Sequence, residues 1–173
     1  GFAVIWLRLF LRRLGIEASI ISGDNPASVE QVARETGLLA HAAASPADKQ
    51  AAIARLQAAG HNVLMVGDGL NDGPALAAAN ASIAPGSASD VGLQAADLVF
   101  VSSSLMAVPR AIAASRASMR IVRQNFALAI GYNVLAVPLA LAGMLTPLIA
   151  AAAMSTSSLI VVANSLRLAR AVK

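Results

Sequence analysis

Two patterns of apolar positions divide the chain near residue 104. Before this point, short apolar runs alternate with amphipathic stretches, and after it two long uncharged stretches follow one another. The alternation predicts strands between helices, which is typical of an α/β layer. The uncharged stretches, at residues 126–144 and 148–166, each have roughly the 20 apolar positions that a helix needs to cross a bilayer. We therefore expect an α/β domain followed by a transmembrane hairpin.

The first part predicts the elements of a doubly wound α/β fold. Strands are expected at 17–21, 62–66, 81–84 and 98–101. The apolar run at 62–66 is of the kind that is buried on both faces of a parallel sheet. Helices are expected at 2–14, 26–36, 46–59, 74–80 and 89–95, with Gly15, Gly37 and Gly60 ending the first three. Three arginines within 2–14 argue against a membrane span there.

The second part predicts a basic amphipathic connecting helix at 105–124 and the two spans within 125–173. Residues 145–147 predict a tight turn outside the cytoplasm. Basic residues lie only at the outer ends of the hairpin, which predicts that these ends are cytoplasmic. They are Arg110, Arg116, Arg120, Arg123, Arg167, Arg170 and Lys173. Two buried helices of a soluble protein are the alternative, which two successive uncharged stretches disfavour.

Composition narrows the choice. Hydrophobic residues make up 57% of the chain and charged residues 13%, and the mean hydropathy is +0.68, which is too apolar for an ordinary soluble domain. A net charge of +4 with 3% aromatic residues and no basic stripe gives no support to nucleic-acid binding. The chain has no cysteine, so a disulfide scaffold and a thiolate metal site are both excluded.

The loop after the strand at 62–66 carries the strongest chemical signal, Gly-Asp-Gly-Leu-Asn-Asp-Gly-Pro-Ala-Leu at residues 67–76. Ligands bind at strand ends in open α/β sheets, and two carboxylates there suit Mg²⁺, which prefers oxygen ligands shared with a phosphate. We expect Asp68 to bind Mg²⁺ directly and Asp72 to hold a metal-bound water or to orient the loop. Asn71 would hydrogen-bond phosphoryl oxygens. A structural turn is the alternative.

Two further elements could contribute to the same site. Ser22, Gly23 and Asp24 follow a predicted strand, where a hydroxyl and a backbone amide can bind a phosphoryl oxygen. Lys49 lies at the start of a predicted helix, where its charge adds to the positive end of the dipole, so an anionic partner is expected. When each is considered alone, the alternatives are favoured: a plain turn for the tripeptide and a solvated surface residue for Lys49.

In this order the three elements resemble the haloacid dehalogenase superfamily, and more closely the phosphorylation domain of P-type ATPases. The family motif GDGxNDxPAL matches residues 67–76, with Gly73 where alanine is usual, and the T/S-GD motif matches residues 22–24. The resemblance implies that residues 1–104 are a partial phosphorylation domain, that Ser22, Gly23, Asp24, Lys49 and Asn71 are catalytic, and that Mg²⁺ and ATP are cofactors.

The nucleophile that the resemblance implies is not in this sequence. In the family it is the aspartate of a DKTGT motif, upstream of a nucleotide-binding domain, and no aspartate here has such a context. The chain begins with Gly1 and looks like a piece of something longer. The missing N-terminal remainder of the pump is therefore an expected partner, and the isolated chain is expected to be inactive.

The spans resemble the copper-transporting P1B subgroup, whose seventh helix carries YN and whose eighth carries MxxSS. Tyr132, Asn133, Met154, Ser157 and Ser158 match and would bind the transported ion. A thioether suits Cu⁺, and neither span has the carboxylate expected for a hard cation. The resemblance implies Cu⁺ export across the inner membrane, a copper chaperone as partner, and a subgroup that supplies copper for cytochrome oxidase assembly.

Two other interpretations remain open. A soluble phosphatase of the dehalogenase superfamily would need a DxD nucleophile and no membrane hairpin. A truncated membrane protein without activity would carry the same residues as the pump fragment.

Overall fold

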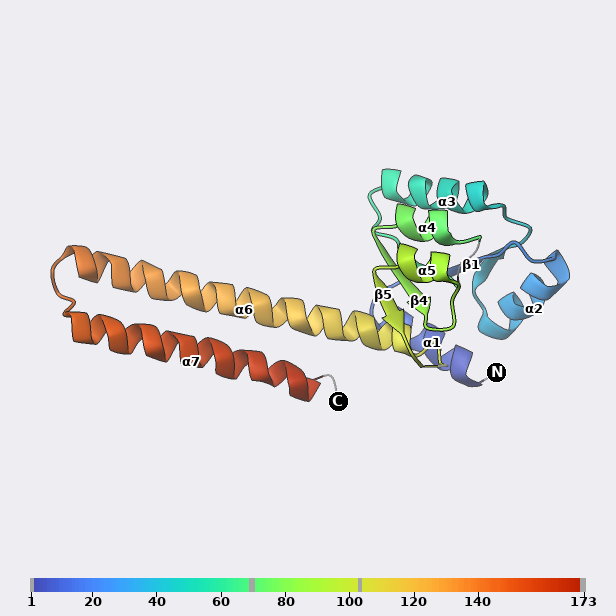
Figure 1. The fold of residues 1–173 in the computed structure, drawn as a ribbon. Helices are drawn as coiled ribbons and strands as arrows, with labels where there is room; N and C mark the ends of the chain where they lie inside the picture. The colour runs from blue at the N-terminus through green and yellow to red at the C-terminus, as the bar shows by residue number, and fades with distance from the viewer. Residues whose placement is uncertain (1, 69–70, 103, 172–173) are drawn as a thin grey trace. The chain divides into compact units, whose positions relative to one another are not determined.

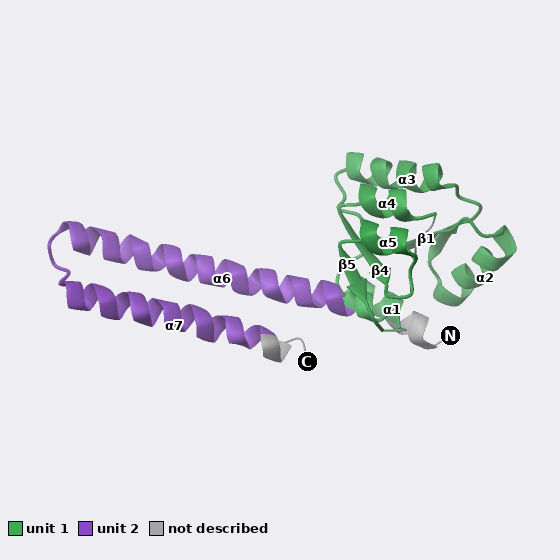
Figure 2. Cartoon of the chain, in the orientation of Figure 1, with its two compact units in different colours: residues 1–109 green, residues 110–173 purple. Residues whose placement is uncertain are grey.

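The computed structural model of the protein describes residues 2–68, 71–102 and 104–171 (Figure 1). It divides into two compact units, residues 1–109 and 110–173 (Figure 2). The first unit alternates helices and strands: α1 (Phe2–Arg13), β1 (Ser19–Ile21), α2 (Pro26–Thr36), β2 (Leu39–His41), α3 (Pro46–Ala58), β3 (Leu64–Val66), α4 (Gly73–Ala78), β4 (Ala81–Pro85), α5 (Asp90–Ala95) and β5 (Leu98–Phe100). The expected α/β class is confirmed.

All pairs of neighbouring strands are parallel, but they form two sheets rather than one layer. β1 pairs with β2, with Ser19 opposite Leu39, and β4 lies between β3 and β5, with Leu64 opposite Ala81 and Ile83 opposite Leu98. β2 was not among the expected strands, because its three residues, Leu-Ala-His, are too few to show a period that separates a strand from a loop.

The burial expected for the strand at 62–66 is wrong. Its residues are half-buried or exposed, and Val66 is 36% exposed. The reason is position: β3 is at the edge of its sheet and, within the described residues, has a hydrogen-bonded neighbour on one side only. The strand with a buried centre is β4, where Ser82, Ile83 and Ala84 are at most 3% exposed.

Helix ends follow the local signals in the sequence. Asn25 caps α2 by accepting a bond from the Ser28 amide at 2.9 Å, and Gly37 ends it with a left-handed φ of +64°, which glycine adopts without strain. Ser45 and Asp48 form a reciprocal capping box at the start of α3. α1 is the helix expected at residues 2–14.

The second unit is a helical hairpin. α6 (Ala107–Leu141) is one helix of 35 residues that includes Pro138, and α7 (Pro147–Ala171) follows after a short loop. The connecting helix and the first span expected from the sequence are thus parts of a single helix. Both helices are long and apolar enough to cross a membrane.

Polar side chains join α6 and α7 near the open end of the hairpin (the helices run side by side in Figure 1). Asn164 donates to Asn125 at 2.9 Å and to Gln124 at 3.3 Å, and Asn125 donates to Ser165 at 3.0 Å. Such hydrogen bonds between polar side chains hold helices together where water is scarce.

Candidate phosphoryl-transfer site

Lys49 is buried and paired. Its side chain lies in the first turn of α3, the residue is 7% exposed, and Nζ lies 2.5 Å from Oδ1 of Asp72. The solvated-surface alternative for Lys49 is therefore wrong, because the ammonium has an anionic partner 23 positions away in the chain. An ammonium in such surroundings requires a counter-charge.

The position of Lys49 follows from how α3 begins. The Ser45 hydroxyl donates to Asp48 at 2.6 Å, the Ser45 amide donates to the same carboxylate at 2.9 Å, and the Asp48 amide donates back to the hydroxyl at 3.2 Å. Bonds from the Ser45 hydroxyl, and secondly from its backbone amide, lower the pKa of Asp48, which is exposed. The capping box fixes the first turn, and Lys49 is the next residue.

The loop after β3 brings Asp72 toward Lys49. A side chain at Gly67 would meet the Asp72 Cβ at 2.9 Å, so only glycine permits this approach. Asp72 occupies the N-cap position of α4 but makes no capping bond with its side chain, which pairs with Lys49 instead. Gly69 and Leu70, the middle of the expected motif, lie outside the described residues.

The two other polar residues of this loop are exposed. The Asp68 carbonyl accepts a bond from the Ser89 amide at 3.0 Å, which ties the end of β3 to the start of α5, while the residue itself remains exposed. Asn71 is also exposed. In the part of the chain that the structure describes, no three His, Asp or Glu side chains come together as a metal site. Two carboxylates suffice for Mg²⁺ only with water and phosphate as the other ligands.

Ser22 and Asp24 form a tight turn after β1. The Ser22 hydroxyl donates to the Asp24 carboxylate at 3.1 Å, and the Asp24 amide donates to Ser22 Oγ at 3.2 Å. The Ser22 carbonyl accepts a bond from the Ala44 amide at 2.9 Å, so this turn is joined to the segment that leads into α3. A side chain at Gly23 would lie 3.2 Å from the Ala44 carbonyl oxygen, so the backbone here is close-packed.

Two glutamines that the sequence analysis did not single out hold α3 against the loop and helix of Asp72. Gln50 Nε2 donates to the Pro74 carbonyl at 3.2 Å, and Gln57 Nε2 donates to the Ala78 carbonyl at 2.9 Å. Their spacing of seven puts them on one helical face, which was a usable signal. No local pattern identified their partners.

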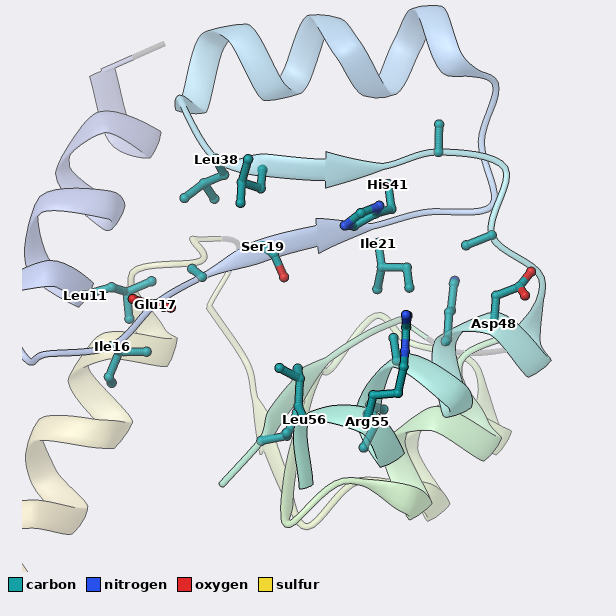
Figure 3. Close-up of a pocket in the computed structure, with 18 of the residues that line it drawn as sticks. Leu11, Ile16, Glu17, Ser19, Ile21, Leu38, His41, Asp48, Arg55 and Leu56 are labelled. Carbon is teal, nitrogen blue, oxygen red and sulfur yellow. The ribbon is translucent and has the colours of Figure 1, made fainter. Parts of the chain in front are cut away.

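A cavity of about 940 Å³ lies beside Lys49 (Figure 3). It is lined by residues of α1, β1, β2 and α3 and by Val63, which precedes β3. The side chains of Ile21 and Leu56 point into it from β1 and α3. The cavity thus lies among α1, the sheet of β1 and β2, and α3, next to the candidate site.

The residues expected to bind a transported ion are only partly brought together. Tyr132 and Ser157 line a cavity of about 390 Å³ between α6 and α7, together with Thr156. Met154 is 63% exposed and does not line this cavity. Asn133 donates to the Ala129 carbonyl of its own helix at 3.0 Å, and Ser158 is exposed.

Comparisons with known proteins agree on one family. Residues 7–80 match the haloacid dehalogenase-like hydrolases. The chain is 59% identical over 155 residues to the nitrogen fixation protein FixI of Rhizobium leguminosarum bv. viciae, covering 89% of this chain and 20% of the relative. It is 44% identical over 159 residues to a copper-exporting P-type ATPase of Staphylococcus aureus, covering 91% and 20%. The chain spans about a fifth of the length of these relatives.

A solved structure extends the match over both units. A zinc-transporting PIB-type ATPase in an E2.Pi state superposes with a TM-score of 0.85 at 37% identity, covering 91% of this chain and 26% of the other. The membrane location expected from the sequence is confirmed by these relatives, with α6 and α7 as the candidate spans. The chain thus matches a segment of heavy-metal P1B-type ATPases, one that contains a haloacid dehalogenase-like domain and two apolar helices.

Proposed function

We propose that this chain is the phosphate-handling and membrane-hairpin segment of a pump that hydrolyses ATP, forms an aspartyl phosphate and exports Cu⁺. The observation that carries the phosphate-handling role is the ion pair between Lys49 and Asp72, which joins the first turn of α3 to the Gly-Asp loop after β3. It brings a buried ammonium to the loop that carries the family motif.

Each residue has a role in the proposed site. Lys49 and the turn at Ser22 and Gly23 bind phosphoryl oxygens, Asp24 holds the Ser22 hydroxyl, and Asn71 donates to the phosphate. The exposed Asp68 carboxylate and the Asp72 carboxylate suit Mg²⁺, which when bound neutralises charge on the phosphoryl group. Because Asp72 contacts Lys49, it acts on the metal through water or by orienting the loop.

The test is a chimera in which this chain replaces the matching segment of the FixI relative, to which it is 59% identical. Phosphoenzyme formed from labelled ATP and Mg²⁺ is measured. We expect Asp68→Asn and Lys49→Met each to lower the rate of phosphoryl transfer at least about 100-fold, as loss of a charged group at a reacting phosphate does. Asp90→Asn, in α5, is the matched control. Unchanged phosphorylation in Asp68→Asn would remove this residue from the site.

The choice of Cu⁺ is supported by the chemistry of the spans. Within residues 126–166 there is no carboxylate, and Met154 supplies a thioether, a soft ligand suited to Cu⁺. A relative at 44% identity is a copper exporter, while the superposed structure at 37% identity is a zinc transporter. A copper chaperone as partner remains a prediction.

Met154→Leu, which keeps size and removes sulfur, tests the ion in the same chimera. We expect loss of Cu⁺-stimulated phosphorylation, with Met144→Leu as the matched control near the loop of the hairpin. If Zn²⁺ but not Cu⁺ stimulated phosphorylation, and Met154→Leu did not change this stimulation, zinc would replace copper as the proposed transported ion. The proposed phosphate site would be unaffected by that result.

A further inference from the structure

The charge of the C-terminal part is one-sided. Between residues 98 and 173 there is no aspartate or glutamate, whereas seven residues are basic: Arg110, Arg116, Arg120, Arg123, Arg167, Arg170 and Lys173. No side-chain carboxylate of the hairpin unit can therefore form an ion pair with its arginines. Their anionic partners have to come from another part of the protein or from its surroundings.

Three of these arginines share one face of α6. Arg116, Arg120 and Arg123 are spaced by four and three residues, which places them in register along a helix. All three are exposed, and they line a groove of about 500 Å³ together with Met119, Gln124 and Ala127. The groove therefore combines three guanidinium groups with a flexible apolar side chain and a small one. We call it the arginine groove.

The groove ends where the apolar span begins. The uncharged stretch starts at Phe126, and a rise of about 1.5 Å per residue puts Arg123 and Arg120 roughly 4 and 9 Å before it along the helix. A bilayer has a polar layer of roughly 5 to 8 Å on each side of its hydrocarbon core. Arg123 is therefore at the depth of the lipid headgroups, and Arg120 lies at their outer edge, where its long side chain can reach them. Arg116 lies further out, and its side chain extends the positive charge away from the bilayer surface.

The inner side of the groove is tied to the second helix of the hairpin. Gln124 Oε1 accepts a bond from Asn164 at 3.3 Å, and Asn164 also donates to Asn125. The groove is thus part of the packed end of the hairpin. A ligand in it would contact the point where α6 and α7 are joined.

We propose that the arginine groove binds the phosphate of an anionic phospholipid from the cytoplasmic leaflet. Guanidinium groups match phosphate oxygens with two parallel bonds, which a point charge cannot do. Met119 and Ala127 face the glycerol and the start of an acyl chain. The proposal relies on the membrane location of α6, and it is independent of the transported ion and of the phosphate chemistry at Lys49.

The experiment uses the whole 173-residue chain in nanodiscs of equal phosphatidylglycerol and phosphatidylcholine, with native mass spectrometry counting the lipids retained on the protein. The test variant is Arg116→Gln/Arg120→Gln/Arg123→Gln. The control, Arg12→Gln/Arg13→Gln/Arg55→Gln, removes the same charge from exposed positions on α1 and α3. Circular dichroism checks that each variant keeps its helices.

We expect the parent and the control to retain more phosphatidylglycerol than phosphatidylcholine. In the test variant the ratio of the two retained lipids should fall at least tenfold, since each basic residue contributes about a fivefold attraction. The variant Arg116→Lys/Arg120→Lys/Arg123→Lys should keep only part of the preference for phosphatidylglycerol. Competition by millimolar glycerol 3-phosphate would show a soluble phosphate site instead. The proposal would be overturned if the parent and the test variant showed the same preference for phosphatidylglycerol, or if the control lost as much of it as the test variant. It would also be overturned if, in the full-length chimera, an acidic segment of the pump displaced the lipid.

Discussion

Individual residues of the candidate site obtain their roles from partners distant in the chain. Lys49 and Asp72 are 23 positions apart and in contact, while Gly67 leaves the space that Asp72 occupies. The sequence marked all three as members of motifs. It predicted a role in metal binding or loop orientation for Asp72 and left Lys49 as either a surface residue or a site residue. The reason is that a contact between a helix and a distant loop has no periodic pattern in the sequence.

At this scale the ion pair makes a testable prediction for stability. Lys49→Met leaves the Asp72 carboxylate, whose side chain is 14% exposed, without its counter-charge. We expect a loss of about 3 kcal/mol in the free energy of unfolding. Urea titration of the chain in detergent with pulse proteolysis measures it. The double variant Lys49→Met/Asp72→Leu should recover most of the loss; a double variant as unstable as the single one would contradict the pairing.

Elements are positioned by their ends and by a few polar bonds between them. α2 and α3 begin at residues that cap them, which the sequence displays directly. α6 and α7 are joined by side-chain hydrogen bonds between residues 124–125 and residues 164–165, about forty positions apart, which the sequence does not display. Local signals thus determine where these helices start, and side-chain bonds determine which neighbour they keep.

The capping box of α3 predicts a dependence on pH. The pKa of Asp48 is lowered in the folded state, so its carboxylate stabilises α3 fully above the unfolded value of about 3.9. This contribution is lost as the pH falls through the lower folded pKa. We expect the difference in unfolding free energy between the parent and Asp48→Asn to stay constant from pH 7 to 5 and to narrow below about pH 4. When Ser45→Ala is present in both proteins, this difference in unfolding free energy should depend less on pH. A pH dependence that Ser45→Ala leaves unchanged would assign the effect to a group other than Asp48.

The side-chain hydrogen bonds between α6 and α7 predict an effect on the stability of the hairpin. Asn164→Ala removes the bonds to Asn125 and Gln124, and we expect the hairpin to lose about 1 kcal/mol of stability in bicelles. Unfolding in increasing SDS, followed by helix content, is the measurement. Ser155→Ala, also on α7, is the control and should change it by less than half as much.

The whole molecule matches one part of its longer relatives. It spans about a fifth of the length of its relatives, and a cavity of about 940 Å³ lies beside Lys49, between α3 and the sheet of β1 and β2. None of its aspartates is in the DKTGT context of the family's nucleophile. We expect that nucleophile in the part of the relatives' length that this chain does not span.

The corresponding prediction concerns activity. The purified 173-residue chain in proteoliposomes should not hydrolyse ATP with Mg²⁺, because a site without its nucleophile cannot form an aspartyl phosphate. The chimera with the FixI relative serves as the positive control. Turnover by the isolated chain that disappears in Asp68→Ala would disprove this and would point to a phosphatase-like activity of the α/β unit.

The sequence by itself determined the alternation of helices and strands, the helix caps, the two apolar spans and the motif at residues 67–76. Each of these features depends on residues that are close together in the chain. Tertiary structure alone decided that the strands form two sheets, that β3 is an edge, that Lys49 is buried against Asp72, and that Tyr132 and Ser157 share a cavity without Met154. These features depend on which distant segments pack together, and packing free energy is shared among many residues, so no single motif encodes it.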